Sequence, residues 1–248
     1  MTNISHELHE LLLAFADDEL CVGQNHAHWI AVSPFLEEDL AFTSIAQDEL
    51  GHARTLYQLL TGPDTADRLA YLREPGEYRC AHIAELNCHE WAHALVRHVL
   101  HDLAERVRWD ALVGSSHAEL AAIAQRSAAE EWFHLRHGVP LLQRLLSTET
   151  GRERLVPVIE QLAPMGSEYF LLAADDGPLV ASGSMTASLD DQLAEWRSDV
   201  EDVVAGAGAD IDWSAAPTSG RQGQRSVEFA PLHDEMVAVL TIDPTASW

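Results

Sequence analysis

The sequence predicts an all-α protein built on a four-helix bundle, and three observations lead to this prediction. Over about the first 175 residues, apolar side chains recur at spacings of three and four, which is the period of an amphipathic helix. The four segments with this pattern are each about 24 to 33 residues long, as in four-helix bundles. No segment shows the alternation of apolar and polar residues that indicates a strand.

The four core helices are expected at about residues 5–30, 36–60, 81–113 and 117–146. The breaks between them fall at Ser33-Pro34, Gly62-Pro63 and Gly114-Ser115-Ser116, because proline and glycine interrupt helices. A polar stretch, residues 64–79, separates the second helix from the third and contains a turn at Pro75-Gly76.

The C-terminal third carries the same helical period in shorter segments. Further helices are expected at about residues 152–174, 188–205 and 228–240. The Gly/Ser/Pro-rich stretch 206–224 is predicted to be a long loop. We expect residues 1–248 to form a single domain, with the core bundle at about 5–147 and the additional C-terminal helices at about 152–248.

Composition excludes several classes of function. The formal net charge is −25 and all 15 cations are Arg, so a nucleic-acid-binding or anionic membrane-binding surface is not expected. No apolar run approaches the ~18 residues of a membrane span, and residues 1–10 do not resemble a signal peptide. These features predict a cytoplasmic protein. The three cysteines, Cys21, Cys80 and Cys88, are expected to be buried thiols rather than a disulfide framework.

Two copies of the motif Glu-x-x-His suggest a metal centre. One is Glu49-Leu-Gly-His52 in the second predicted helix, and the other is Glu131-Trp-Phe-His134 in the fourth. Residues i and i+3 of a helix share a face, so each pair can chelate one metal ion. Two such motifs on two helices of one bundle are the recipe for a carboxylate-bridged dimetal site.

The same recipe needs one more carboxylate on each remaining helix. Glu19 lies 30 residues before the first motif, and Asp102 lies 29 residues before the second. Separations of this size bring two residues level in an antiparallel helix pair, with Glu105 as an alternative to Asp102 one turn further on. Carboxylates with imidazoles favour Fe or Mn. The alternative is a metal-free bundle in which these carboxylates and histidines pair with each other.

A competing motif, His89-Glu-Trp-Ala-His93, matches the zinc-protease signature H-E-x-x-H. A zinc protease needs a third protein ligand and a mixed sheet-and-helix context, and the extended form of its signature has a glycine that is absent here. We therefore expect these histidines to be polar-face, core or ligand-orienting residues.

Three stretches of the sequence resemble a known family. Residues 38–54, which include Gln47-Asp-Glu-Leu-Gly-His52, are similar to the second helix of the A and C subunits of phenylacetyl-CoA ring-1,2-epoxidases. Glu131-Trp-Phe-His-Leu-Arg136 resembles their fourth helix. The tail, with Gly220-Arg-Gln-Gly223, Pro231-Leu-His-Asp-Glu-Met236 and the terminal Pro244 and Trp248, is similar to the C-type (PaaC-like) subunits.

The resemblance implies a ferritin-like bundle within a multicomponent monooxygenase of phenylacetate catabolism. The complex epoxidises phenylacetyl-CoA with O₂ and electrons from a reductase subunit. The diiron A subunit is its catalytic component, and the C subunit docks beside it. In several C subunits the ligand positions are degenerate, whereas all six positions named above hold ligand-type residues here. Two Fe (or Mn) ions or no metal, and a subunit role or a self-sufficient diiron or dimanganese oxidase, therefore remain alternatives.

Partner subunits are expected for two further reasons. A chain with a charge of −25 has few cations with which to hold the phosphates of a CoA ester, so substrate binding is expected mainly in the partner. Trp29, Trp91 and Trp109 are available for a helix-on-helix interface or for the core. The expected partners are the catalytic A-type subunit and the reductase, and the chain alone is expected to form a homodimer.

Overall fold

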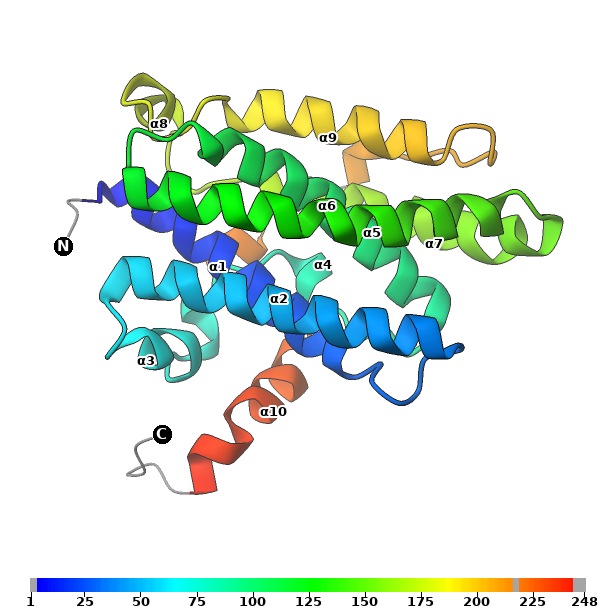
Figure 1. Ribbon diagram of the computed structural model, residues 1–248, viewed down its shortest axis with the longest axis horizontal. Coiled ribbons are helices and arrows are strands. Elements are labelled where there is room, and N and C mark those ends of the chain that lie inside the picture. The colour runs from blue at the N-terminus through cyan, green and yellow to red at the C-terminus, as the bar shows by residue number, and fades with distance from the viewer. Residues whose placement is uncertain (1–3, 216–218, 243–248) are drawn as a thin grey trace. The chain divides into compact units, whose positions relative to one another are not determined.

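The computed structural model describes residues 4–215 and 219–242, and within these ranges it contains helices and no strands (Figure 1). The all-α prediction is therefore confirmed. The terminal Pro244 and Trp248 lie outside the described residues. No helix in the described part combines the length and the apolarity that crossing a bilayer requires.

The chain divides into two compact units, residues 1–11 with 88–218 and residues 12–87 with 219–248. The long helices of the first unit are α5 (Trp91–Val113), α6 (Ala118–Leu146), α7 (Glu149–Gly166) and α9 (Leu189–Val203). Shorter elements complete it: η2 (Ser167–Phe170), α8 (Gly177–Ala181) and η3 (Trp213–Ala215).

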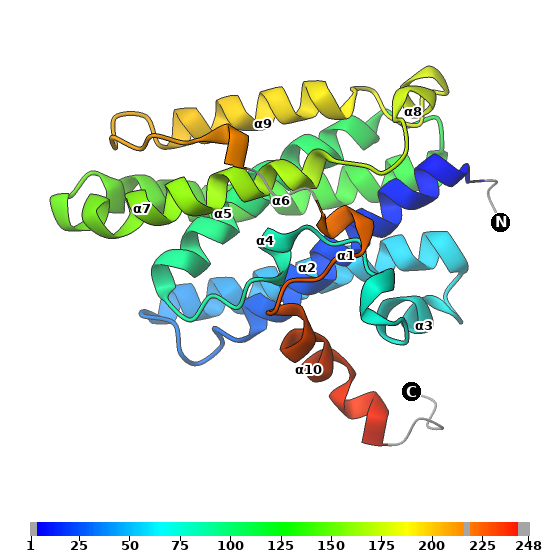
Figure 2. The same cartoon turned by 180° about the vertical axis from the view of Figure 1, so that it is seen from behind.

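Helix α5 is the centre of the first unit. It packs against α6, α7 and α9 (Figures 1 and 2), and its side chains are buried on almost every side. Trp196 of α9 closes one contact, because its indole N–H donates to the carbonyl of Leu100 at 3.0 Å. Gly166 permits this packing, since a Cβ there would lie 2.6 Å from the Trp196 ring.

The second unit is built on α1 (His6–Ala27), of which residues 12–27 belong to it, and α2 (Leu36–Thr61). Its shorter elements are α3 (Ala66–Tyr71), η1 (Pro75–Glu77), α4 (His82–Glu85), η4 (Gly220–Gln222) and α10 (Phe229–Ile242). The C-terminal segment anchors through aromatic rings: Phe229 and His233 lie 5.1 and 5.4 Å from Tyr78, measured between ring centroids.

The prediction for the third core helix is wrong at its start. Instead of a helix from residue 81, the chain forms the single turn α4, leaves the helical conformation over residues 86–90 and enters α5 at Trp91. Helix α3 falls within the predicted polar stretch, and α8 was not predicted. Trp109 is a core residue with no exposed surface, whereas Trp29 and Trp91 are half-buried.

Candidate metal centre

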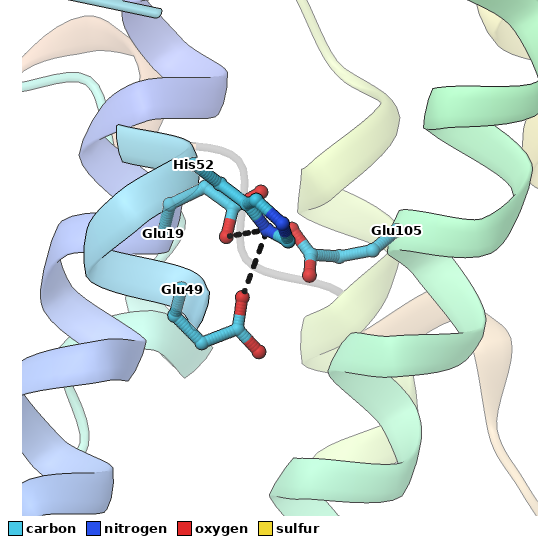
Figure 3. A group of neighbouring side chains, drawn as sticks. All are labelled: Glu19, Glu49, His52 and Glu105. Carbon is cyan, nitrogen blue, oxygen red and sulfur yellow. Dashed lines mark ion pairs between the residues drawn. The ribbon is translucent and has the colours of Figure 1, made fainter. Parts of the chain in front are cut away.

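Three predicted ligands gather between α1 and α2. Glu19 comes from α1, and Glu49 and His52 come from successive turns of α2 (Figure 3). His52 Nδ1 lies 3.6 Å from Glu19 Oε2 and 3.6 Å from Glu49 Oε2. Both carboxylates are fully buried and the imidazole is 3% exposed. We call these three residues the α1–α2 cluster.

The other three predicted ligands gather between α5 and α6. Asp102 comes from α5, and Glu131 and His134 come from α6. Each offers a ligand atom within 4.8 Å of the others, and His134 Nδ1 lies 3.3 Å from Glu131 Oε2. All three side chains are buried. We call them the α5–α6 cluster.

Glycines bring the helices of each pair close together at the clusters. A Cβ on Gly23 of α1 would lie 3.0 Å from Glu49 Cβ, so α1 approaches α2 where the first motif sits. A Cβ on Gly138 of α6 would lie 2.9 Å from His98 Nε2 of α5. Both helix pairs thus use a glycine at the contact.

Histidines of α5 hold the carboxylates of the same helix. His98 Nδ1 lies 3.1 Å from Asp102 Oδ1, one turn along the helix. His101 Nε2 lies 3.5 Å from Glu105 Oε2, and its Nδ1 lies 3.0 Å from the hydroxyl of Tyr169. Glu105, the alternative to Asp102, is therefore buried and engaged by a second histidine. Such contacts to a ligand set its orientation.

The residues of the zinc-protease motif are divided by a helix boundary. His89 is exposed and precedes α5, whereas His93 lies within that helix. The two histidines therefore do not occupy successive turns of one helix, which is the arrangement that the protease signature needs.

Sequence reasoning missed a buried network directly before Glu19. Asp17 is fully buried and accepts hydrogen bonds from the Tyr57 hydroxyl at 2.5 Å and from the backbone N–H of Arg79 at 2.7 Å. Arg73 forms an ion pair with the same carboxylate. Burial raises the pKa of Tyr57 and the adjacent Asp17 raises it further. Burial opposes the charge of Arg73, but Asp17 outweighs it and raises the pKa of this guanidinium.

Asp18 has a corresponding partner from the C-terminal segment. Arg221 donates to both of its carboxylate oxygens, at 2.9 and 2.8 Å, and the backbone N–H of Ala81 donates at 2.8 Å. Arg225 pairs likewise with buried Glu85 at 2.5 Å. The Gly220–Gly223 segment noted in the sequence thus holds α1 from the far end of the chain. The sequence signal was Arg221 within that segment, but the sequence does not show that Asp18 is its partner.

The donor set suits hard first-row metal ions. Ligand atoms bound ~2.1 Å from one ion in adjacent positions lie roughly 3.0 to 3.4 Å apart. The histidine–glutamate separations, 3.6 Å around His52 and 3.3 Å at His134, need only small adjustments to reach that range, and ligand atoms of Asp102, Glu131 and His134 lie within 4.8 Å of one another. Two carboxylates and one imidazole per cluster, all buried, match the ligands of iron or manganese. The residues therefore fit a metal ion at each cluster.

Comparison with known proteins identifies the family. The model of the family described as phenylacetic acid catabolic protein matches residues 2–248. The C subunit of the 1,2-phenylacetyl-CoA epoxidase of Escherichia coli (strain K12) is 26% identical over 249 residues, covering 98% of this chain and all of the relative. The chain belongs to the phenylacetic acid catabolic protein family, whose members are ferritin-like.

Proposed function

We propose that this chain is the C-type subunit of a phenylacetyl-CoA epoxidase and that it holds a dimetal centre of its own. The full-length match to the family and to the C subunit of the E. coli enzyme carries the subunit role. A subunit of a multicomponent epoxidase implies partner subunits. The partners proposed are a catalytic, ferritin-like A-type subunit and a reductase, in the cytoplasm.

The two clusters carry the proposal of a metal centre. In ferritin-like carboxylate proteins, two helices each supply one carboxylate and two supply a Glu-x-x-His motif. The α1–α2 cluster and the α5–α6 cluster each contain one single carboxylate and one Glu-x-x-His motif. We propose that Glu19, Glu49, His52, Asp102, Glu131 and His134 are the ligands of two metal ions, with each cluster supplying three of them.

The protein's own residues have defined tasks in such a centre. A pair of iron ions would supply the capacity to activate O₂ when bound. His52 and His134 would each provide one nitrogen ligand, while His98 orients Asp102. The Arg pairs of Asp17 and Asp18 hold the turn of α1 that presents Glu19, and the burial of both clusters keeps bulk water away. We expect the electrons to come from the reductase subunit.

The complete ligand set also supports a second candidate, a self-sufficient diiron or dimanganese oxidase. A purely structural subunit has no need for six buried ligand-type residues. Reconstitution separates the two candidates. The chain, the catalytic subunit and the reductase would be tested singly and in combination for O₂- and NADPH-dependent conversion of phenylacetyl-CoA.

We expect turnover only when the catalytic subunit is present, and stable co-purification of the two ferritin-like chains. Turnover by this chain with the reductase alone would establish the second candidate. Failure of the pair to co-purify at micromolar concentration would contradict the subunit role.

Metal analysis tests the centre separately from activity. We expect about two iron or manganese ions per chain, and loss of at least half of that content in Glu49→Ala and Glu131→Ala. Glu130→Ala is the matched control, because it removes a carboxylate next to Glu131 on the same helix without touching a predicted ligand. Equal metal content in all four proteins would contradict the proposed centre.

A further inference from the structure

The outward face of α2 carries large apolar side chains at one end. Leu36 and Leu40 are 69% and 63% exposed, and Phe35, just before the helix, is 65% exposed. The exposed face continues along the helix at spacings of three and four, opposite the buried face of Glu49 and His52. We call this face the α2 stripe; it consists of Leu36, Glu37, Leu40, Ser44, Gln47, Gly51 and Arg54.

The α2 stripe differs in charge from the rest of the chain. Its charged residues are one acid, Glu37, and one cation, Arg54, whereas the whole protein has 40 acidic residues against 15 cations. A helix face kept only for solubility on such a protein would be expected to carry an excess of acids. Exposed leucines followed by small and uncharged residues are instead typical of the centre of a protein interface, where charged residues are depleted.

No contact within the chain explains why position 51 is a glycine. It sits in the interior of α2, where glycine costs about 1 kcal/mol relative to alanine. A Cβ at this position would meet no atom within 4 Å, and the backbone there is helical. Gly23, by contrast, is required by the nearby Glu49 side chain. The remaining physical reason for a glycine is the close approach of another backbone or side chain from outside the chain.

A groove beside Gly51 gives such a side chain a place to enter. It has a volume of about 320 Å³ and lies between α2 and α3, over α1. Leu20, Leu50 and Ala70 line it with apolar surface, and Arg54 and Asp67 add one charge of each sign.

We propose that the α2 stripe is the docking surface for a helix of the partner ferritin-like subunit. The partner helix places a large apolar or aromatic side chain in the groove beside Gly51 and a carboxylate opposite Arg54. This inference rests on the proposed subunit role. A second copy of this chain fits less well, because two molecules with a charge of −25 repel each other.

A second exposed apolar patch, on α6, is the rival surface. Trp132 and Phe133 are 51% and 66% exposed. However, Arg136 stacks on the Trp132 ring at 4.6 Å and covers part of it from within the chain. Neither Trp132 nor Phe133 lines the groove beside Gly51.

Affinity measurements with the purified catalytic subunit test the proposal. Gly51→Gln adds a helix-favouring, uncharged side chain in the proposed path of the partner, and Leu36→Glu/Leu40→Glu places two acids on the stripe. We expect each variant to weaken association at least tenfold while retaining wild-type helicity and metal content. Ala122→Gln adds the same side chain to the exposed face of α6 and serves as the matched control, with unchanged affinity.

Three results would overturn the proposal. Wild-type affinity in both α2 variants would exclude the stripe as the interface. Weakening by Ala122→Gln or Trp132→Ala, without an effect of the α2 variants, would transfer the interface to α6. Dissociation of a homodimer by Gly51→Gln, with the heteromer intact, would assign the stripe to a second copy. If the wild-type chains do not associate at all, the proposed subunit role itself fails, and that result is seen before any variant is made.

Discussion

At the level of single residues, the six candidate ligands were accessible from the sequence and their supporting partners were not. Glu49 and His52 can be recognised in the sequence because they are three residues apart. Glu19 can be recognised because its separation from Glu49 matches the length of a helical hairpin. The ion pairs of Asp17 with Arg73 and of Asp18 with Arg221 join residues 56 and 203 positions apart. No local period encodes such pairs, so only the folded structure shows them.

Loss of Arg221 should destabilise the protein strongly. Arg221→Met leaves the Asp18 carboxylate buried without its guanidinium, which typically costs about 3 to 5 kcal/mol. We expect the free energy of unfolding, measured by urea denaturation, to fall by that order. The double variant Asp18→Asn/Arg221→Met should recover part of the loss, because no isolated charge remains. A double variant as unstable as the sum of its single changes would show that the two residues act independently.

Alkaline pH should destabilise the fold through buried acids. Burial raises the pKa of Cys80 and, together with Asp17, that of Tyr57, above the ordinary values of 9.0 and 10.0. Both groups are thus neutral in the folded state at pH values where they ionise in the unfolded chain. The stability they contribute is complete below about pH 9 and is lost as pH rises towards the higher folded values.

Urea denaturation between pH 8 and 11 measures this loss, with Tyr57→Phe as the comparison. The decline above pH 10 should be shallower in that variant, since one of the ionising groups is gone. Parallel curves for the two proteins above pH 10 would contradict the assignment to Tyr57.

At the level of elements, the long helices follow the apolar period, and the departures have physical causes. The predicted third helix starts late because residues 86–90 are not helical, although no proline or glycine marks the break. Tertiary contacts hold the turn α4 directly before this segment: the Asn25 side-chain amide donates to the carbonyl of Ala84 at 3.0 Å, and Glu85 pairs with Arg225. Local propensity cannot anticipate such contacts.

Three glycine-to-alanine changes should have different signs. Gly23→Ala and Gly138→Ala push a Cβ to 3.0 Å from Glu49 Cβ and to 2.9 Å from His98 Nε2. Crowding of this kind typically costs about 1 to 3 kcal/mol, partly offset by the helix preference of alanine. Gly51→Ala meets no atom within 4 Å and should stabilise the isolated chain by up to about 1 kcal/mol.

Thermal unfolding of the three variants gives the comparison, with the metal-free protein used throughout. If Gly51→Ala were the most destabilised of the three, the account of open space above that residue would be wrong. A neutral Gly23→Ala would show that α1 shifts at little cost.

At the level of the whole molecule, the excess of negative charge is the dominant property, and the burial of arginines increases this excess at the surface. Of the 15 arginines, Arg97, Arg108 and Arg221 are buried. Fewer cations are therefore available on the surface than the 15 that the sequence contains. The composition alone revealed the excess of acids, but only the structure shows that part of the positive charge serves interior carboxylates such as Asp18.

Salt should therefore stabilise this protein. Mutual repulsion among surface carboxylates opposes the compact state, and the Debye length falls from about 20–30 Å at the lowest ionic strengths to about 4 Å near 0.5 M. Buried pairs such as Asp17 with Arg73 are screened much less, so their contribution persists. We expect the Tm of the isolated chain to rise by about 2 to 4 °C between 20 mM and 500 mM NaCl, equivalent to about 1 kcal/mol for a domain of this size. KCl should act equally, because screening depends on ionic strength and not on the cation. A fall in Tm with salt would mean that surface ion pairs, such as Arg106 with Glu195, outweigh the repulsion.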